Sequence, residues 1–214
     1  MASNNYIYKM SNAGGMSTIT RYTDMLAGNT TWNPWEPAGA YESIASVTVG
    51  SSGAASISFT SIPSTYQHLQ IRGIARNNSG TSGLAFIRTK INSDATSGNY
   101  YGHYLYGSGS AASAAGVAGQ TNGATAGFVG NNSNTASSFP VVIIDILDYA
   151  NTSKNKTIRS LTGGDFNDTN GGLALISGLW MSTSAITSIE ITSDSGTGFV
   201  QYSSFALYGI KGGN

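Results

Sequence analysis

One segment of the chain, Phe139–Tyr149, constrains the fold more than any other because it is a dense run of β-branched residues. Branching at Cβ stiffens χ1 and suits a pleated strand better than a helix. The run is apolar at consecutive positions, which is typical of a strand covered on both faces. Pro140 stands near its start, where the missing N–H disturbs a ladder least. The segment is therefore predicted to be the innermost strand of a β-sandwich.

Short strand-like segments fill the chain from Ser43 onward and are separated by turns rich in Gly, Ser and Asn. The first two, Ser43–Val49 and Ala55–Phe59, are expected to form a hairpin around Gly50–Gly53. Gly107–Gly123 contains only small or polar residues apart from Val117 and is expected to be a long loop. The other expected strands are Gln67–Arg76, Leu84–Ile91, Asn99–Tyr106, Ala124–Val129, Lys154–Thr162, Gly172–Met181, Ile186–Thr192 and Gly198–Ile210. This pattern predicts an all-β fold over residues 43–214, a jelly-roll-like antiparallel β-sandwich of about ten strands.

Residues 1–42 differ from the rest and are expected to form an extended N-terminal arm. Thr18–Leu26 has the apolar spacing of a short helix, and the proline-containing segment Trp32–Pro37 is expected to be extended. Such a segment cannot build its own core, so its large apolar side chains are expected to contact either the chain's own sandwich or a partner. The candidate attachment residues are Ile19, Tyr22, Met25, Leu26, Trp32 and Trp35.

The low charge of the chain narrows the classes of partner. Charged residues make up 9% of the sequence, and ten basic residues balance ten acidic ones. This composition gives no electrostatic footprint for nucleic acid, and a surface with so little repulsion favours a protein that works inside an assembly. There is no cysteine for a disulfide or thiolate site. Neither a signal peptide nor a membrane-spanning run is recognisable.

Residues able to carry catalysis are few, so neither an enzymatic role nor a cofactor is expected. The two histidines, His68 and His103, have no metal ligands at suitable spacing. Asp145 and Asp148 are three positions apart, which places them on opposite sides of a strand and makes them a poor glycosidase pair. Residues 165–170 begin like a calcium loop, although Asn170 stands where the loop needs Gly. An Asx-rich turn at Asp165 is favoured, with calcium binding as the alternative.

An aromatic cluster in Asn99–Tyr106 is the one candidate for contact with a ligand. A strand would place Tyr100, Tyr104 and Tyr106 on one side and Tyr101, His103 and Leu105 on the other. Aromatic rings with polar tips can stack on a sugar, but tyrosine is also enriched at subunit interfaces. A role in an interface or in the core is favoured, and glycan contact is the alternative.

Five segments of the chain have distinctive sequences: Ala13–Gly28, Ser61–Arg76, Val142–Asn151, Gly178–Thr187 and Phe199–Gly212. Together they resemble a family of virion structural proteins of tailed bacteriophages. The resemblance implies a β-sandwich surface component, often trimeric, of the fibre, tail-appendage or capsid-decoration type, and it carries over no catalytic residue.

The expected function is therefore a non-enzymatic virion component, assembled in the host cytoplasm. Its arm would attach it to capsid or tail proteins, and its sandwich would face outward as a homotrimer. Neither nucleic acid nor a membrane is an expected partner. A carbohydrate-binding module for host-receptor recognition is the alternative, and a depolymerising enzyme is less favoured because the sequence shows no convergent pair of titratable groups.

Overall fold

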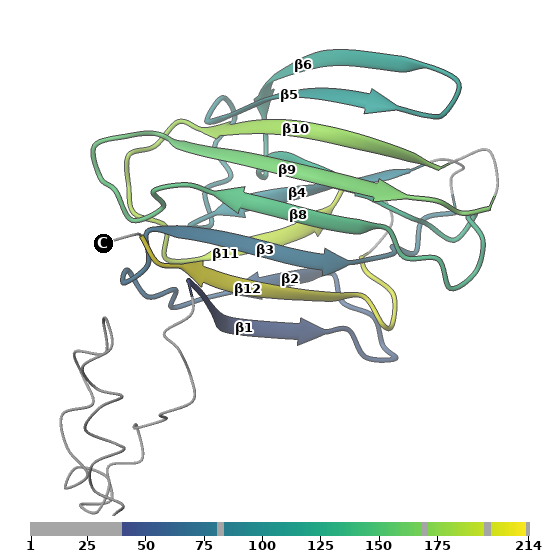
Figure 1. Ribbon diagram of the computed structural model, residues 1–214, viewed down its shortest axis with the longest axis horizontal. Coiled ribbons are helices and arrows are strands. Elements are labelled where there is room, and N and C mark those ends of the chain that lie inside the picture. The colour runs from purple at the N-terminus through teal and green to yellow at the C-terminus, as the bar shows by residue number, and fades with distance from the viewer. Residues whose placement is uncertain (1–39, 81–83, 168–170, 195–197, 213–214) are drawn as a thin grey trace, which may run out of the picture. The chain divides into compact units, whose positions relative to one another are not determined.

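The computed structural model describes residues 40–80, 84–167, 171–194 and 198–212 (Figure 1). The chain divides into two units, residues 1–39 and 40–214, and the described residues belong to the second. All six candidate attachment residues of the arm lie outside the described residues. The first strand begins at Tyr41, so the β domain starts slightly before Ser43.

The described residues form twelve strands and no helix, so this part of the chain has no helix that could cross a membrane. The strands are β1 (Tyr41–Thr48), β2 (Ser56–Phe59), β3 (His68–Ile74), β4 (Ala85–Ile91), β5 (Tyr100–Gly107), β6 (Ala112–Gln120), β7 (Ala124–Val129), β8 (Val141–Ile146), β9 (Lys156–Gly164), β10 (Gly172–Trp180), β11 (Ile189–Ser193) and β12 (Ser204–Ile210).

The strands build two antiparallel sheets in a jelly-roll arrangement. The larger sheet has eight strands in the order β1-β12-β3-β8-β9-β10-β5-β6, and the smaller has four in the order β2-β11-β4-β7. Eight strands form the jelly roll: β1, β2, β3, β4, β7, β8, β11 and β12. Taken in chain order, they change sheet at every step except from β4 to β7. This alternation is the double Greek key of a jelly roll. The remaining strands, β5, β6, β9 and β10, extend the larger sheet beyond the jelly roll (Figure 1). The predicted all-β, jelly-roll-like sandwich is confirmed.

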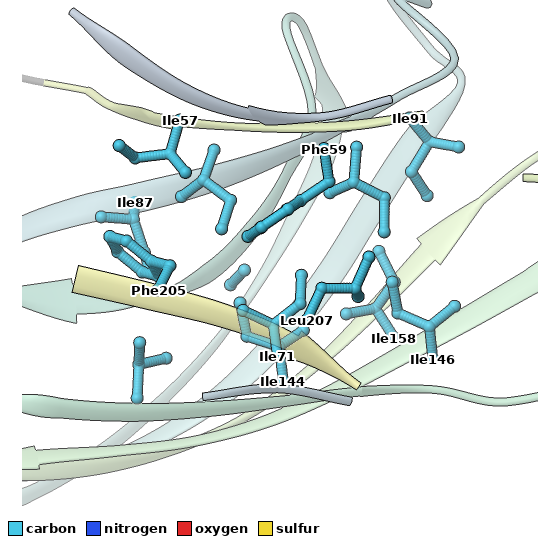
Figure 2. Close-up of a cluster of buried hydrophobic side chains, with 14 of the residues drawn as sticks. Ile57, Phe59, Ile71, Ile87, Ile91, Ile144, Ile146, Ile158, Phe205 and Leu207 are labelled. Atoms are coloured by element: carbon cyan, nitrogen blue, oxygen red, sulfur yellow. The ribbon is translucent and has the colours of Figure 1, made fainter. Parts of the chain in front are cut away.

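The core lies between the two sheets, where aliphatic side chains from both inner faces meet (Figure 2). The larger sheet contributes Ile71 and Ile144, and the smaller contributes Ile87 and Ile91, all fully buried. The burial pattern alternates along β4 and β9, so each strand turns every second side chain inward. A second cluster of Phe128, Ala174 and Ile176 lies under the extended part of the larger sheet.

Two of the expected connections are wrong. Ser43–Val49 and Ala55–Phe59 do not form a hairpin, because β1 pairs with β12 while β2 pairs with β11 in the other sheet. Their apolar residues face one core from opposite sides, which a paired hairpin would not allow. The segment Gly107–Gly123 is not a long loop, since it contains β6, which pairs with β5. A ladder of main-chain hydrogen bonds needs no apolar side chains, so small residues hid this strand.

The opening segment is central, as predicted, but it is covered on one face only. β8 lies between β3 and β9 in the larger sheet. Val142, Ile144 and Ile146 are fully buried, whereas Val141 on the other face is 49% exposed. The prediction of cover on both faces is therefore wrong for the described part of the chain.

Candidate functional site

The outer face of the larger sheet, turned away from the smaller sheet, carries a row of exposed aliphatic residues. Leu105 on β5 lies directly opposite Leu175 on β10. Leu175 in turn lies opposite Leu161 on β9, and Leu161 lies opposite Ile143 on β8. Directly opposed side chains in neighbouring strands are in contact range, so the four form a continuous row across four strands.

Three more aliphatic residues widen this row into a patch. The next row of the face holds Leu173 on β10, Val141 on β8 and Ile74 on β3, with Val141 directly opposite Ile74. The seven residues are called here the apolar stripe: Ile74, Leu105, Val141, Ile143, Leu161, Leu173 and Leu175. Ile143 is half-buried, and the other six are between 43% and 59% exposed. A contiguous apolar patch of this kind marks an interaction site more often than a free surface.

A polar row runs beside the stripe and is internally satisfied. The guanidinium of Arg159 donates to the carboxylate of Asp145 at 2.8 Å. The amide of Gln70 donates to the other oxygen of Asp145 at 2.7 Å, and Arg72 donates to the Gln70 carbonyl at 2.7 Å. With donors on both oxygens, Asp145 serves as an anchor of the outer face. In the part of the chain that the structure describes, no second carboxylate belongs to the hydrogen-bonded row of Asp145, so the row contains no acid–base pair.

A shallow depression of about 390 Å³ adjoins the stripe on β1, β12, β3 and β8. Small residues, Ser46, Ser204 and Ala206, contribute to its lining, and Ile74 and Val141 are shared with the stripe. The guanidinium of Arg72 lies 5.9 Å from the centre of the Tyr41 ring, within range of a cation–π contact. The depression and the stripe thus form one continuous face.

Tyr100 is the one member of the aromatic cluster that the structure buries completely. Its hydroxyl accepts the N–H of Ile91 at 3.1 Å and donates to the carbonyl of Asp94 at 3.0 Å. Burial raises the pKa of Tyr100 to about 12. Tyr100 therefore belongs to the core and lies on no surface that a glycan or a subunit can reach.

The other four aromatic candidates divide between two faces of β5, as the period of two predicts. Tyr104 and Tyr106 are half-buried on the inner side, with ring centres 6.2 Å from Phe86 and 5.9 Å from Phe128, respectively. Tyr101 and His103 are exposed on the outer face beside Leu105. A Cβ at Gly116 on β6 would lie 2.9 Å from the His103 Nε2, so a larger residue there would displace the exposed imidazole. The five aromatic candidates do not converge on one surface.

Asp94 forms a polar hub that sequence reasoning missed. Its carboxylate accepts the indole N–H of Trp180 at 2.7 Å, the side-chain amide of Asn99 at 2.8 Å and the backbone N–H of Thr96 at 2.9 Å. Burial on its own raises the pKa of Asp94, but these hydrogen bonds outweigh it and hold the pKa well below its usual range. The hub fixes the turn after β4 against the end of β10, which is a structural role.

Two buried cations were also missed, because no spacing in the sequence indicates them. The ammonium of Lys156 donates to the carbonyls of Lys154 at 2.8 Å and Thr183 at 3.0 Å. The guanidinium of Arg76 donates to the carbonyls of Thr135 at 2.6 Å and Asn134 at 2.9 Å. Burial lowers the pKa of both groups. Each cation joins two chain segments and so supports the fold.

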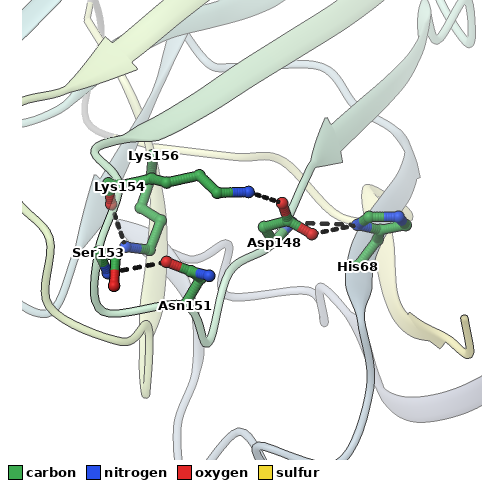
Figure 3. A network of polar contacts seen from close by, with 6 residues as sticks. All are labelled: His68, Asp148, Asn151, Ser153, Lys154 and Lys156. Carbon is green, nitrogen blue, oxygen red and sulfur yellow. Dashed lines mark hydrogen bonds and ion pairs between the residues drawn. The ribbon is translucent and has the colours of Figure 1, made fainter.

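His68 and Asp148 belong to a network at one end of the larger sheet (Figure 3). The Nδ1 of His68 accepts the backbone N–H of Asp148 at 3.0 Å, and the carboxylate of Asp148 pairs with Lys154. The hydrogen bond to Lys154 is the main cause that lowers the pKa of Asp148. Asp148 lies beyond the end of β8, while Asp145 lies on the outer face with Arg159. The two carboxylates have separate partners and form no pair.

Asp165 makes the turn that was favoured for it, since its Oδ1 accepts the backbone N–H of Asn167 at 2.8 Å. Residues 168–170, which complete the loop considered for calcium, lie outside the described residues. Within the described residues no three His, Asp or Glu side chains gather where they could hold a metal ion.

No family model, curated protein or solved structure matches this chain. The described residues offer an apolar sheet face with an adjoining depression and no convergent set of reactive groups, and such a face is suited to association.

Proposed function

We propose that this chain is a non-enzymatic structural component of a tailed-phage virion. Its N-terminal arm attaches it to capsid or tail proteins, and the β-sandwich is displayed outward. The observation that carries the proposal is the apolar stripe, because a half-exposed aliphatic surface on a rigid sheet is suited to an assembled particle and unfavourable on a free protein. The resemblance of five segments to virion structural proteins supports the choice of particle.

The distribution of charge supports an assembly role. Most of the carboxylates in the described residues form ion pairs with cations of the same chain. Examples are Asp148–Lys154, Asp145–Arg159 and Glu190–Lys90. Exposed pairs of this kind contribute little stability, but they leave a surface with a weak field. Copies of such a protein can be packed closely without strong electrostatic repulsion.

The same pairing supports a non-enzymatic role. A hydrolase needs two titratable groups directed at one substrate atom. Asp145 and Asp148 are engaged with different cations, and Asp94 is held by three donors at a turn. None of these carboxylates is arranged as an acid–base pair, which argues against a depolymerising enzyme.

Incorporation into particles tests the proposal. Particles assembled with a chain that lacks residues 1–39 should contain none of the protein, while the truncated chain should remain soluble with the circular dichroism of a β protein. The cut is placed before Tyr41 because Glu42 on β1 accepts the hydroxyl of Tyr66 at 2.9 Å and pairs with Lys211. The full-length chain is the control. Normal occupancy of the truncated chain would contradict attachment through the arm, and absence of the full-length chain from purified particles would contradict the virion role.

Host-surface glycan binding is a second candidate, favoured by one observation. Tyr101 is 37% exposed on the outer face, and His103 is exposed on the same side of β5. A stacking ring beside a hydrogen-bonding imidazole is suited to a sugar. Binding on a glycan array that is lost in Tyr101→Ala and kept in Tyr202→Ala, a control at the 66% exposed Tyr202, would support this role. An array without signal for the full-length chain would remove it.

A further inference from the structure

We propose that the outer face of the larger sheet is a self-association interface and that its occupant is a second copy of this chain. The inference rests on the proposed assembly role, to which it adds the surface. The elements involved are β5, β10, β9, β8 and β3, which carry the apolar stripe, together with the adjoining depression.

The sequences of the central strands are those of strands covered on both sides. β8 has aliphatic residues on both faces, with Val142 and Ile144 inward and Val141 and Ile143 outward. β10 repeats this, with Ile176 inward and Leu173 and Leu175 outward. An antiparallel strand with one face in water normally alternates between apolar and polar residues. Among the described residues nothing covers the outward set, so a cover must come from elsewhere.

The size of the face suits a stable interface with another protein. The seven strands from β1 to β5 in the order of the sheet, about 4.8 Å apart and with about seven residues each at about 3.3 Å per residue, present roughly 800 Å². A standard specific interface buries about 800 Å² on each partner. The face is built on a sheet, so little conformational entropy is lost when it is covered. The same face of one second copy is therefore large enough to cover it.

One pair of opposite charges on the face, Asp145 and Arg159, is self-complementary, which favours a second copy as the occupant. Two copies related by a two-fold axis present the same patch to each other, so the stripe of one copy meets the stripe of the other. Asp145 and Arg159 have opposite charges and lie directly opposite each other on β8 and β9. Arg159 donates one guanidinium N–H group to Asp145 of its own copy, and its side chain is 66% exposed, so its remaining donors can also reach Asp145 of a second copy. Two sheets packed face to face at about 10 Å bring such rows into contact.

Analytical ultracentrifugation of the full-length chain over a range of concentrations tests the inference. The wild-type chain should self-associate, and Leu161→Glu and Leu175→Glu should each weaken association at least tenfold, because a carboxylate would be buried in the stripe. Leu147→Glu is the matched control, since Leu147 is 49% exposed against 48% for Leu175 but lies beyond the end of β8. Its association should equal that of wild type. A wild-type chain that stays monomeric to about 0.1 mM, or stripe variants that associate like wild type, would overturn the inference.

Thiol labelling tests self-association through the same face if the charged variants fold poorly. The chain has no cysteine, so Ser177→Cys places a single thiol on the outer face, and Ser184→Cys places one at an exposed position outside the strands. Thiol labelling should slow at least tenfold with rising concentration for Ser177→Cys alone. Protection that does not depend on concentration in a monomer would show that residues of the same chain cover the face, and this would overturn the inference. Neither measurement uses particles, so a failure of the virion role would leave the result standing.

Discussion

Asp94 shows how single residues far apart in the sequence fix this fold. Its carboxylate joins Trp180 on β10 to the turn that follows β4, across 86 positions. Trp180 would otherwise bury an indole N–H without an acceptor, and an unpaired buried donor costs about 1–3 kcal/mol. The backbone of the same residue accepts the hydroxyl of Tyr100, so one aspartate serves two buried aromatic side chains.

Replacement of Asp94 by Asn should lower the free energy of unfolding by about 1–3 kcal/mol at neutral pH. The folded-state pKa of Asp94 is depressed, so the stability it contributes is present above the unfolded-state pKa of about 3.9 and is lost as pH falls toward the folded-state pKa. Asp94→Asn should therefore flatten the loss of stability below about pH 4. Urea unfolding at a series of pH values measures this.

Asp165→Asn is the control for that experiment, because Asp165 is exposed and makes only a local turn. Its free energy of unfolding should stay within about 0.5 kcal/mol of wild type. Equal acid sensitivity in wild type and Asp94→Asn would show that the hydrogen bonds to Asp94 do not stabilise the folded chain.

β6 is the element whose stability depends least on side chains. Eight of its nine residues are exposed, and it lies at the edge of the larger sheet. Alanine and glycine have low strand propensity, so its main-chain hydrogen bonds to β5 are its principal support. An exposed edge without charged residues or proline also lacks the usual protection against pairing with other chains.

Hydrogen exchange should therefore reveal β6 as the least protected strand of the larger sheet. Its amides should exchange at least 100-fold faster than those of β8 and β9, because local opening of β6 exposes almost no apolar surface. Mass spectrometry of peptides from residues 108–123 and 141–164 gives the comparison. Similar protection at low protein concentration would mean that β6 is held by more than its ladder with β5.

At the scale of the whole molecule, the jelly roll joins the two ends of the domain. β12 lies between β1 and β3, and it contributes the buried residues Phe205 and Leu207. Most contacts in this topology join residues distant in sequence, so pairing costs loop entropy before it yields stability. The domain is therefore expected to fold as one cooperative unit.

Removal of residues 204–214 should abolish folding. It removes β12 and with it the pairing partner of both β1 and β3. The truncated chain should lack cooperative thermal unfolding and should bind a hydrophobic dye, as followed by circular dichroism and fluorescence. A chain without residues 1–39 is the control and should unfold cooperatively. Cooperative unfolding of the chain without β12 would show that the remaining strands form an independent core.

The sequence predicts those parts of the fold that depend on local pattern. The alternation in Gln67–Arg76 and Leu84–Ile91 located β3 and β4, and the β-branched run located β8. The sheet to which each strand belongs depends on distant partners, which is why β1 and β2 were wrongly paired. The apolar stripe was missed for the same reason, since Leu105, Leu161 and Leu175 become neighbours only through the strand register. The sequence does not separate the buried Tyr100 from the other aromatic residues of its strand, because its residue type does not reveal its depth.

The pairing of Tyr41 with Ile210 makes the β domain a self-contained cassette. Paired residues in antiparallel strands lie about 5 Å apart, so the domain's entry and exit points are almost coincident. A domain with this geometry can be inserted into a surface loop of an unrelated protein without separating the two ends of that loop. A short linker between these two points would also permit circular permutation, with new termini at the turn between β5 and β6.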